Sequence, residues 1–563
     1  MATPVDSRHL ARFPDLPSLL VQLLHNRGMN EPDAVRAFLR GGFVEGNPFR
    51  LKGMNEAVFR VRQAIRRGER IAVYGDFDAD GITATALLVQ ALTALGAQVE
   101  SYIPHRVDEG YGLNLGALRT LYRRGVRLVI TVDCGIRSVS EVNQARRGLD
   151  LIITDHHSVG RELPPAVAIV NPRQPGCRYP FKDLAGVGVA FKLAQALMRA
   201  SKETRPPEVS EDRWLDLVAL GTIADLAPLL GENRQLVQRG LAALNEATRP
   251  GVAALMANAG VRRGEVDALA VGYRLGPRLN AAGRIDTAER AYRLLTSEDP
   301  LEVQELAEEL GRLNQRRQEL TEETVAAAEA QILADDPNAP LFLVANPSFL
   351  PGIIGLAASR LSEAYYRPCI LVAQGEAESR GSCRSIPEFN ITAALDKCAD
   401  LLIRYGGHAA AAGFTIATEN LAPLYRRLRA IAAEQLAGVE LMPTLQIDAE
   451  VPLEEVSWAT HALLQELEPC GVGNPQPVLL SRGIQVRERR LMGPDQRHLR
   501  LVLRDERGVA WDAVLFHRAG LLEQLPDRVD VVYTLEPTEW NLEKRLQLNI
   551  QDLRPAQSPD NLN

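Results

Sequence analysis

The chain has 563 residues, which is enough for three or four domains of ordinary size. With 46% hydrophobic and 24% charged residues, it has the composition of a globular protein that buries several cores. Its 64 basic and 71 acidic residues give a formal charge of −7, which excludes a basic field over the whole chain. Any contact with nucleic acid must therefore be local.

The cysteines and the hydropathy pattern indicate the compartment. The six cysteines are scattered and form no C-x-x-C pair, so they predict neither a zinc knuckle nor a disulfide framework. Nowhere do about 18 uncharged apolar residues run together, and the N-terminus lacks the basic and apolar regions of a signal peptide. We expect a cytoplasmic protein in a reducing compartment, with no membrane contact.

The first elements predict an α/β fold. Residues 1–45 contain two short helical patterns, LPSLLVQLL and PDAVRAFLR, which we expect to form a packing extension. From residue 70 the chain alternates between short apolar runs and helical or loop segments; the runs are IAVY, VESYIP, VRLVITVD, LDLIITD and AVAIVN. Near-continuous apolar strands of this kind predict a parallel sheet that is covered by helices on both faces.

Three further regions follow. A helical region spans about 181–330 and ends in a long, highly charged segment that is typical of a solvent-bridging helix. A second α/β pattern begins at PLFLVANP and ends near residue 435, and from about 442 five or six short β-like runs predict a small β-barrel. The expected divisions are a helical extension 1–45, a catalytic domain 46–295, a connecting helix 296–335, a smaller α/β domain 336–438, a barrel 439–555 and a disordered tail 556–563.

Acidic and imidazole side chains gather where the first strands end. In open α/β sheets, ligands bind beyond the carboxyl ends of the strands. Three consecutive strand ends here carry Asp76, Asp78 and Asp80, then Asp133, then Asp155, His156 and His157. A further acid, Asp225, lies in an apolar helical stretch where a lone carboxylate would be costly.

These side chains predict a metal site. Carboxylate oxygens with one or two imidazoles suit Mn²⁺ or Mg²⁺ better than zinc. A pair of ions about 3.5–4 Å apart, bridged by one carboxylate, is the usual apparatus for cleaving phosphoesters. The alternative for each acid taken alone is a helix cap or a turn residue.

Eight motifs occur in a familiar order. They are DFDADGITATA, PHRVDEGYGL, VDCGI, TDHH, LVALGTIADLAPLLGENR, GPRLNAAGR, GSCRS and GGHAAAAG. In this order they resemble the DHH phosphoesterase superfamily, and its bacterial RecJ branch closely, from about residue 35 to the β-rich C-terminus. The resemblance implies an α/β fold in which a parallel-sheet DHH domain is joined by a long helix to a smaller α/β DHHA1 domain, followed by an OB-fold β-barrel.

The resemblance also implies roles for the residues at the strand ends. The residues that match its metal-binding motifs are Asp76, Asp78, Asp80, Asp133, His156 and Asp225. Asp133 is the expected bridging ligand and is assigned to catalysis, together with His157, which would face the scissile phosphate. Which of the first three acids binds which ion stays open, and so does the choice between Mn²⁺ and Mg²⁺.

Substrate contacts need hydrogen-bond donors. Arg106, Arg278, Arg284, Ser382 and Arg384 lie in Gly-rich, loop-like contexts where a guanidinium could fork onto phosphate oxygens, although each arginine could instead be a surface or salt-bridge residue. The resemblance implies a pocket for a 5′-terminal phosphate made by these residues, with Arg278 the least firmly assigned.

Two further segments could contact nucleic acid. GGHAAAAG is either a close backbone approach to a ligand or a tightly packed helix start, and the resemblance assigns His408 to substrate. Arginines also cluster on the early barrel strands, at Arg482, Arg487, Arg489, Arg490, Arg497 and Arg500, and we expect this local basic patch to contact DNA.

The function expected from the residues is that of a metal-dependent phosphoesterase with an added nucleic-acid-binding barrel. The resemblance implies a single-stranded-DNA-specific 5′-to-3′ exonuclease that uses two metal ions, releases 5′-mononucleotides and acts in recombination and repair. It also implies a monomer that works with a single-stranded-DNA-binding protein and a helicase. The alternatives are a phosphodiesterase acting on short oligonucleotides or cyclic dinucleotides, and an inactive replication scaffold.

Overall fold

The computed structural model describes residues 1–40, 46–106, 108–201, 209–540 and 543–556. The chain divides into two compact units. The first contains Met1–Glu45, Pro228–Gln235 and Thr444–Asn563, and the second contains Gly46–Ala227 and Leu236–Pro443. Of the predicted disordered tail, residues 557–563 lie outside the described residues.

The first sheet of the second unit is parallel, as predicted. Its order is β2-β1-β3-β4-β5, and the strands are β1 (Arg70–Tyr74), β2 (Gln98–Tyr102), β3 (Val126–Val132), β4 (Asp150–Thr154) and β5 (Ala168–Val170). Tyr74 and Val129 pack on one face with helices α6 (Leu115–Arg123) and α7 (Val139–Ala145). Ile71 and Val73 of β1 point to the opposite face from Tyr74 and are also fully buried. Both faces of the sheet are therefore covered.

A helical region follows this sheet. The helices that pack with each other and with the sheet are α4 (Met54–Arg67), α5 (Ala79–Ala94) and α8 (Gly186–Ser201). The later ones are α9 (Leu215–Ala224), α10 (Gly231–Glu246), α11 (Pro250–Asn258), α12 (Ala268–Ala270), the π-helical turn η3 (Val271–Leu275), α13 (Gly276–Ile285) and α14 (Glu289–Thr296). The predicted connecting helix is α15 (Pro300–Asp335), a single helix of 36 residues that Asp299 caps.

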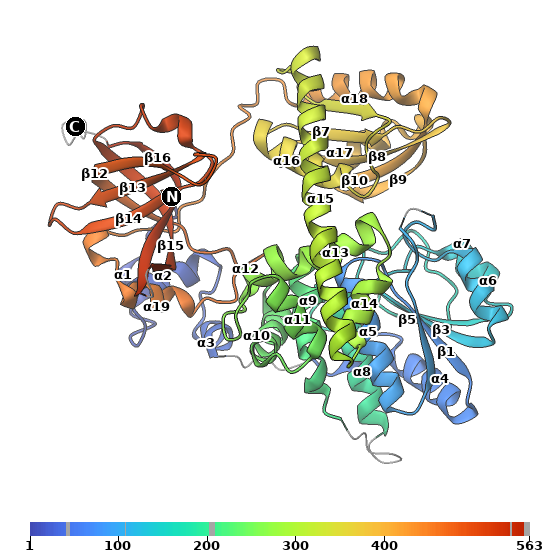
Figure 1. The fold of residues 1–563 in the computed structure, drawn as a ribbon. Helices are drawn as coiled ribbons and strands as arrows, with labels where there is room; N and C mark the ends of the chain where they lie inside the picture. The colour runs from blue at the N-terminus through green and yellow to red at the C-terminus, as the bar shows by residue number, and fades with distance from the viewer. Residues whose placement is uncertain (41–45, 107, 202–208, 541–542, 557–563) are drawn as a thin grey trace. The chain divides into compact units, whose positions relative to one another are not determined.

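Helix α15 joins two parts of the second unit. It contacts helices α11, α13 and α14 (Figure 1). It also contacts strand β6 (Phe342–Asn346) of the second sheet and helix α16 (Ile354–Tyr365). Ala328 and Ile332 of α15 lie in a core with Ile354 and Leu361 of α16. The helix is therefore anchored by apolar packing as well as by its charged surface.

The second sheet is mixed. Its order is β6-β7-β8-β10-β9, with β6 and β7 parallel and the other neighbours antiparallel. The strands after β6 are β7 (Cys369–Ala373), β8 (Glu378–Arg384), β9 (Leu402–His408) and β10 (Ala411–Ala417), and the helices are α17 (Ile391–Asp396) and α18 (Leu421–Gln435). GGHAAAAG thus spans the turn between two paired strands, and the helix-start alternative is wrong.

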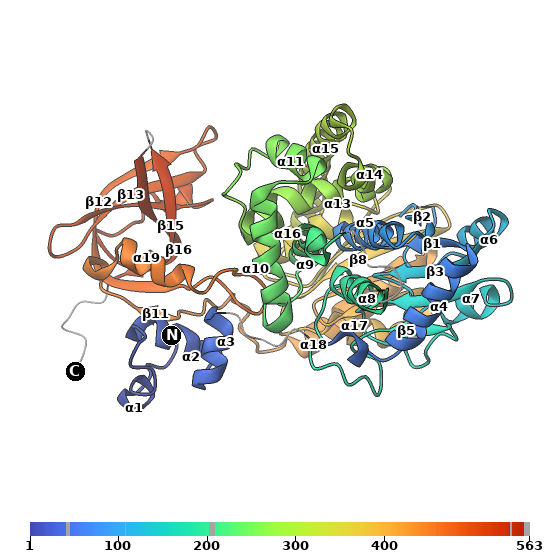
Figure 2. The same cartoon turned by 90° about the horizontal axis from the view of Figure 1, so that it is seen from below.

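The first unit contains the predicted barrel. Its strands are β11 (Ala449–Glu450), β12 (Leu479–Met492), β13 (His498–Arg504), β14 (Ala510–Leu515), β15 (Arg528–Trp540) and β16 (Glu543–Pro555). They follow the order β11-β12-β13-β14-β16-β15, and pairing between β12 and β15 closes the barrel (Figure 2). Helices α1 (Ser7–Leu10), α2 (Ser18–Asn26), α3 (Pro32–Arg40) and α19 (Trp458–Gln465) complete the unit.

The N-terminal helices share a core with the barrel. Leu23 and Leu24 of α2 lie in one hydrophobic cluster with Leu499 and Leu501 of β13. Helix α2 of the predicted extension therefore packs against the barrel, while residues 41–45 lie outside the described residues. All six cysteines are free thiols, and no helix within the described part of the chain has the length and apolarity that a membrane crossing requires.

Candidate active site

The three acids after β1 have different local roles. Asp78 caps α5, because its Oδ1 accepts hydrogen bonds from the backbone N–H groups of Asp80 and Gly81 at 3.0 and 3.1 Å. The carboxylate of Asp80 accepts from the N–H groups of Gly186 and Val187, both at 2.7 Å. These two residues begin α8, whose N-terminus favours a negative charge. The helix-cap interpretation thus holds for Asp78 and fixes the orientation of its neighbours.

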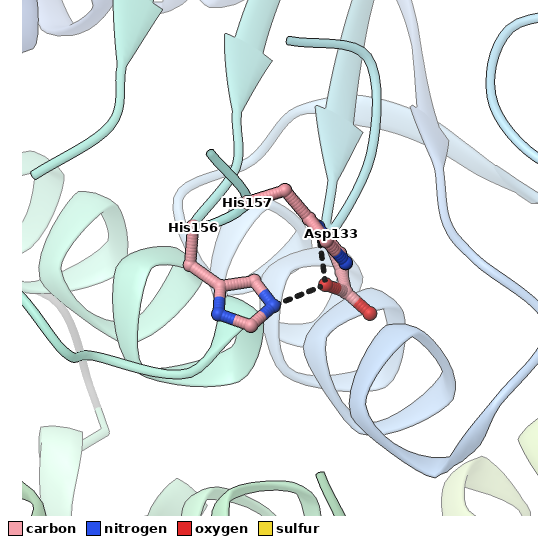
Figure 3. A group of neighbouring side chains, drawn as sticks. All are labelled: Asp133, His156 and His157. Carbon is pink, nitrogen blue, oxygen red and sulfur yellow. Dashed lines mark ion pairs between the residues drawn. The ribbon is translucent and has the colours of Figure 1, made fainter. Parts of the chain in front are cut away.

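Asp133 stands at the end of β3 with an unusual backbone conformation. Its φ of 61° lies in the left-handed region, which is uncommon for a residue with a side chain. Its Oδ1 lies 3.1 Å from Nε2 of His156 and 3.7 Å from Nδ1 of His157 (Figure 3). Gly186 lies against it, since a Cβ at that glycine would stand 2.6 Å from the Cβ of Asp133. The aspartate is therefore closely confined.

Asp155 orients the second histidine. Its Oδ1 accepts from the N–H of His157 at 3.0 Å and lies 2.8 Å from Nδ1 of the same ring, while its Oδ2 accepts from the N–H of Ile136 at 2.9 Å. The hydroxyl of Tyr111 lies 3.2 Å from Nδ1 of His157. Burial lowers the pKa of His157, but the hydrogen bond to Asp155 and the negative charges of Asp155, Asp76 and Asp78 together outweigh it, so the pKa is raised. Asp155 thus holds this imidazole rather than joining the ligand sets described next.

The strand ends form three overlapping sets of ligand atoms. Each set lies within 4.8 Å, and the sets are Asp76, Asp78 and Asp133; Asp80, His156 and Asp225; and Asp133, His156 and His157. Asp225, at the end of α9, has its Oδ2 3.8 Å from Nε2 of His156. All six residues predicted to bind metal are therefore brought together, and Asp133 belongs to two of the sets.

The electrostatics of this cluster favour a bound cation. Burial and the neighbouring acids raise the pKa of Asp80 to about 7 and that of Asp225 to about 9. The same two causes raise the pKa values of Asp76 and Asp133, and burial lowers that of His156 to about 3, so its ring is neutral. Oδ1 of Asp76, Oδ1 of Asp133 and Nε2 of His156 are buried without hydrogen-bond partners within the described residues. Buried oxygen and nitrogen atoms of this kind fit divalent metal ions.

A cleft of about 1150 Å³ adjoins the cluster. From the first sheet and its loops it is lined by Phe77, Arg106, Asp155 and His157, and from the second sheet by Ser382 and His408. The register of the second sheet places Ser382 beside Gly413 and Gly406, and Arg384 beside Ala411 and His408. The predicted substrate residues of this sheet thus occupy two rows that share one face and are separated by the row of Cys383.

Three arginines converge from separate elements. Burial and the charges of Arg106 and Arg384 lower the pKa of Arg284 to about 9, and burial and the charge of Arg106 lower that of Arg384. A Cβ at Gly355, in the first turn of α16, would lie 3.0 Å from Oγ of Ser382 and 3.2 Å from Arg384. The guanidinium of Arg384 donates to Ser359 at 3.0 Å. Arginines beside a helix N-terminus make a ready anion site.

The loop-like contexts predicted for several of these residues are wrong. Arg278 and Arg284 lie in helix α13, and Ser382 and Arg384 lie in strand β8. Arg278 is set apart from the cleft, since its guanidinium donates to Asn258 at 3.0 Å and to the carbonyl of Arg274 at 2.7 Å.

The arginines of the barrel are largely occupied by acids. Five of the six predicted to contact DNA form ion pairs: Arg482 with Glu450 and Asp530, Arg489 with Asp527, Arg490 with Glu488, Arg497 with Asp495, and Arg500 with Asp512. Because the neighbouring acids cancel much of the charge, the patch is less basic than the sequence suggests.

Tyr111 and Arg404 are cleft residues that were not predicted from the sequence. Tyr111 contacts His157, and Arg404 lines the cleft from β9. Tyr111 could have been found, because it is an aromatic residue between two glycines inside a motif. Arg404 offers no such signal, since only the strand register brings it opposite Thr415.

Three family models match the chain. The DHH family N-terminal domain matches residues 70–222, the DHHA1 domain matches 340–434, and the RecJ OB domain matches 447–552. A Bacillus subtilis protein named single-stranded-DNA-specific exonuclease RecJ is 41% identical over 544 residues, which cover 95% of this chain and 67% of the relative.

Solved structures of RecJ from Thermus thermophilus are also similar. The structure in complex with Mn²⁺ has a TM-score of 0.83 at 34% identity and covers 98% of this chain and 78% of that one. The structure with Mg²⁺ has a TM-score of 0.78 at 33% identity, with coverage of 98% and 77%. With the relative's 41% identity and the three domains in order, the chain belongs to the RecJ family of single-stranded-DNA-specific exonucleases.

Proposed function

We propose that this protein degrades single-stranded DNA from the 5′ end, hydrolysing phosphodiester bonds by a mechanism that uses two divalent metal ions and releasing 5′-mononucleotides. Two neighbouring features carry the proposal: overlapping sets of metal-ligand atoms at the strand ends, and a cleft lined by Arg106, Ser382 and His408. Two relatives of this family are named single-stranded-DNA-specific exonucleases, and this supports the choice of substrate.

The metal ions would be held by six residues. One set would be Asp80, His156 and Asp225, and the other would be Asp76, Asp78 and Asp133. Asp133 would be shared, because its Oδ1 lies 3.1 Å from Nε2 of His156. Mn²⁺ or Mg²⁺ fits these oxygen-rich ligands, and the related structures contain those two ions. When bound, such ions lower the pKa of water and stabilise negative charge on the reacting phosphate.

The chain's own side chains would orient the substrate. His157, held by Asp155 and protonated more readily than an ordinary histidine, would face the scissile phosphate as a hydrogen-bond donor or acid. Arg106, Arg284, Ser382 and Arg384 would hold the 5′-terminal phosphate near the first turn of α16, and His408 would contact the strand from β9. A fixed 5′ phosphate would set the polarity, because only the bond next to it would reach the ligand cluster.

Partners and location are part of the proposal. A single-stranded-DNA-binding protein and a helicase would supply single strands during recombination and repair. We propose a monomer that works in the cytoplasm, a reducing compartment that suits the six free cysteines. The domain boundaries stay as predicted from the sequence.

Digestion of a single strand labelled at either end tests the function. In Mn²⁺ or Mg²⁺ we expect mononucleotides to be released progressively from the 5′ end, and in chelator we expect no cleavage, since the clustered acids would have no cation. Binding without cleavage under any metal would favour the scaffold alternative. Cleavage of substrates of two or three nucleotides alone would favour the small-substrate phosphodiesterase.

Replacing Arg384 with Gln tests the 5′-phosphate pocket. We expect kcat/KM on a 5′-phosphorylated strand to fall by about 10–100-fold, the loss of a charge-assisted hydrogen bond, and the preference over a 5′-hydroxyl strand to disappear. Arg427→Gln is the control, because Arg427 lies on α18 and pairs with Asp400. If Arg384→Gln kept the full preference for phosphate, the pocket would lie elsewhere.

A further inference from the structure

A second, smaller cavity is lined in part by Arg284. It has a volume of about 140 Å³ and is lined by residues of α9, η3, α13, α15 and α16, which are Ala224, Gly272, Gly276, Pro277, Asn280, Arg284, Arg317 and Leu356. Among these lining residues there are two arginines and no carboxylate. The cavity is therefore cationic, although the protein as a whole is acidic.

Arg317 is the unusual member of this lining. It lies on α15, and its Nε is buried without a hydrogen-bond partner within the part of the chain that the structure describes. Its neighbour Arg316 faces solvent and pairs with Glu319 and Glu323 at 3.1 and 3.4 Å. A buried guanidinium nitrogen without an acceptor is energetically costly. The position of Arg317 therefore needs an explanation, whereas that of the solvent-exposed Arg316 does not.

The neighbourhood of Arg317 adds positive charge rather than compensating it. Burial lowers the pKa of Arg317, and the charges of Arg360 and Arg278 lower it further. Arg284 also lines the cavity, and the charges of Arg106 and Arg317 both lower its pKa. A site that gathers several guanidinium groups in this way is complementary to a phosphate group.

The backbone around the cavity also suits a ligand. The π-helical turn η3 leads directly into α13, and π-helical turns are frequent at functional sites. Gly276 has little room for a side chain, because a Cβ there would lie 3.0 Å from the carbonyl oxygen of Val271 and 3.2 Å from the Cβ of Ala224. Ala224 immediately precedes Asp225, a member of the metal-ligand sets, so the cavity adjoins the catalytic cluster through one residue.

We propose that this cavity is a second phosphate-binding site, in which Arg317, beside Arg284 of the 5′-phosphate pocket, holds a phosphate group of the bound strand beyond the one at the 5′ end. The inference rests on the proposed function and deepens it by adding a subsite. The same phosphate chemistry is offered by the released nucleotide, so the experiment must separate a strand phosphodiester from a product monoester.

The test compares Arg317→Gln with its matched control Arg316→Gln. KM and kcat are measured on a long single strand and on a two-nucleotide substrate over a range of salt, and inhibition is measured with dTMP. We expect Arg317→Gln to raise KM on the long strand about 5–10-fold, with kcat unchanged, and to reduce the salt slope by about 0.7, the loss of one phosphate contact. The two-nucleotide substrate should be unaffected, and Arg317→Lys should recover part of the affinity.

Each other outcome also decides the matter. If Arg317→Gln weakened inhibition by dTMP and left KM unchanged, the site would be confirmed and its ligand would be the released nucleotide. If Arg317→Gln behaved like Arg316→Gln in every measurement, the site would be refuted. A general fall in kcat on both substrates would also refute it, because that pattern indicates a structural role for Arg317.

A separate measurement keeps the site distinct from the exonuclease activity. Inorganic phosphate should raise the melting temperature of the wild-type protein more than that of Arg317→Gln, whether or not DNA is cut. If the wild type cut no DNA, the proposed function would fail, while this comparison would still accept or reject the cavity as a phosphate site.

Discussion

Replacing Asp133 with Asn is expected to lower the exonuclease rate by at least about 10³-fold, which corresponds to about 4 kcal/mol of lost transition-state stabilisation. Asp133 shares one ligand set with Asp76 and Asp78, and its Oδ1 lies 3.1 Å from Nε2 of His156 in the other proposed position, so its loss would affect both metal positions at once. The amide is nearly the same size as the carboxylate, and the change therefore removes charge rather than volume. Initial rates in saturating Mn²⁺ measure the effect.

The same substitution should stabilise the protein in chelator. Burial and four neighbouring aspartates raise the pKa of Asp133, so its ionised form is unfavourable near neutral pH without a cation. A carboxyl group whose pKa is raised on folding destabilises the folded state above its unfolded pKa, and a neutral amide removes that cost. We expect a higher melting temperature for Asp133→Asn without metal, and a smaller rise on adding Mn²⁺.

Asp299→Asn is the control for this pair of effects. Asp299 caps α15 through the N–H of Leu301, and Asn can cap a helix equally well. It should leave both the rate and the melting temperature close to those of the wild type. An Asp133→Asn protein that kept its activity, or that was less stable in chelator, would contradict the assignment of Asp133 as the shared ligand.

Replacing Gly186 with Ala should disable the site by a different route. A new Cβ would stand 2.6 Å from Cβ and 2.7 Å from Cγ of Asp133, so either α8 or the aspartate must move. The backbone N–H of Gly186 also donates to Asp80, which ties the movement to a second ligand. We expect a loss of stability of about 1–3 kcal/mol from overpacking and a fall in kcat of about 10²-fold from misplaced ligands.

Gly188→Ala makes the same change two residues later in α8. There the nearest atom to a new Cβ is the flexible Cδ2 of Leu184 at 3.3 Å. Ala favours a helix interior over Gly by about 0.5–1 kcal/mol, and this gain should offset the small movement of Leu184. The variant should therefore be close to neutral in stability and activity. Denaturation and rate measurements on the two variants decide the point; equal behaviour would show that the site tolerates movement of α8.

The metal-ligand cluster could be predicted because parallel strands bring their carboxyl ends to one edge. Asp78, Asp133 and His156 follow three strands that are distant in sequence, and topology alone places them together. The sequence could not reveal that Asp80 also meets the start of α8, because that contact depends on how a helix more than a hundred residues away is packed.

The arginine contexts were harder to predict because glycine has more than one structural use. Gly283 and Gly381 suggested loops, but both lie in regular elements where close packing excludes a Cβ. At Gly283 it would stand 2.3 Å from the carbonyl oxygen of Phe77, and at Gly381 it would stand 2.2 Å from the ring of Phe414. Composition cannot separate glycine used for a turn from glycine used for close packing.

Helix α15 shows a similar limit. Its charged sequence correctly predicts a long helix, yet composition cannot show that Arg316 faces solvent while Arg317 lines a cavity. The orientation of each residue follows from the helical period of 3.6 residues once the buried face is known. That face was set by packing partners that the local sequence does not contain.

Because α15 is one unbroken helix, the number of residues in it sets how one wall of the cleft is rotated relative to the other. One residue inserted in an α-helix turns everything after it by about 100° and advances it by about 1.5 Å. Along these 36 residues, such an insertion would swing the β8–β10 wall away from the strand ends without altering a single side chain in either. The spacing along a helix that carries no ligand is thus as much a part of the reaction geometry as the ligands themselves.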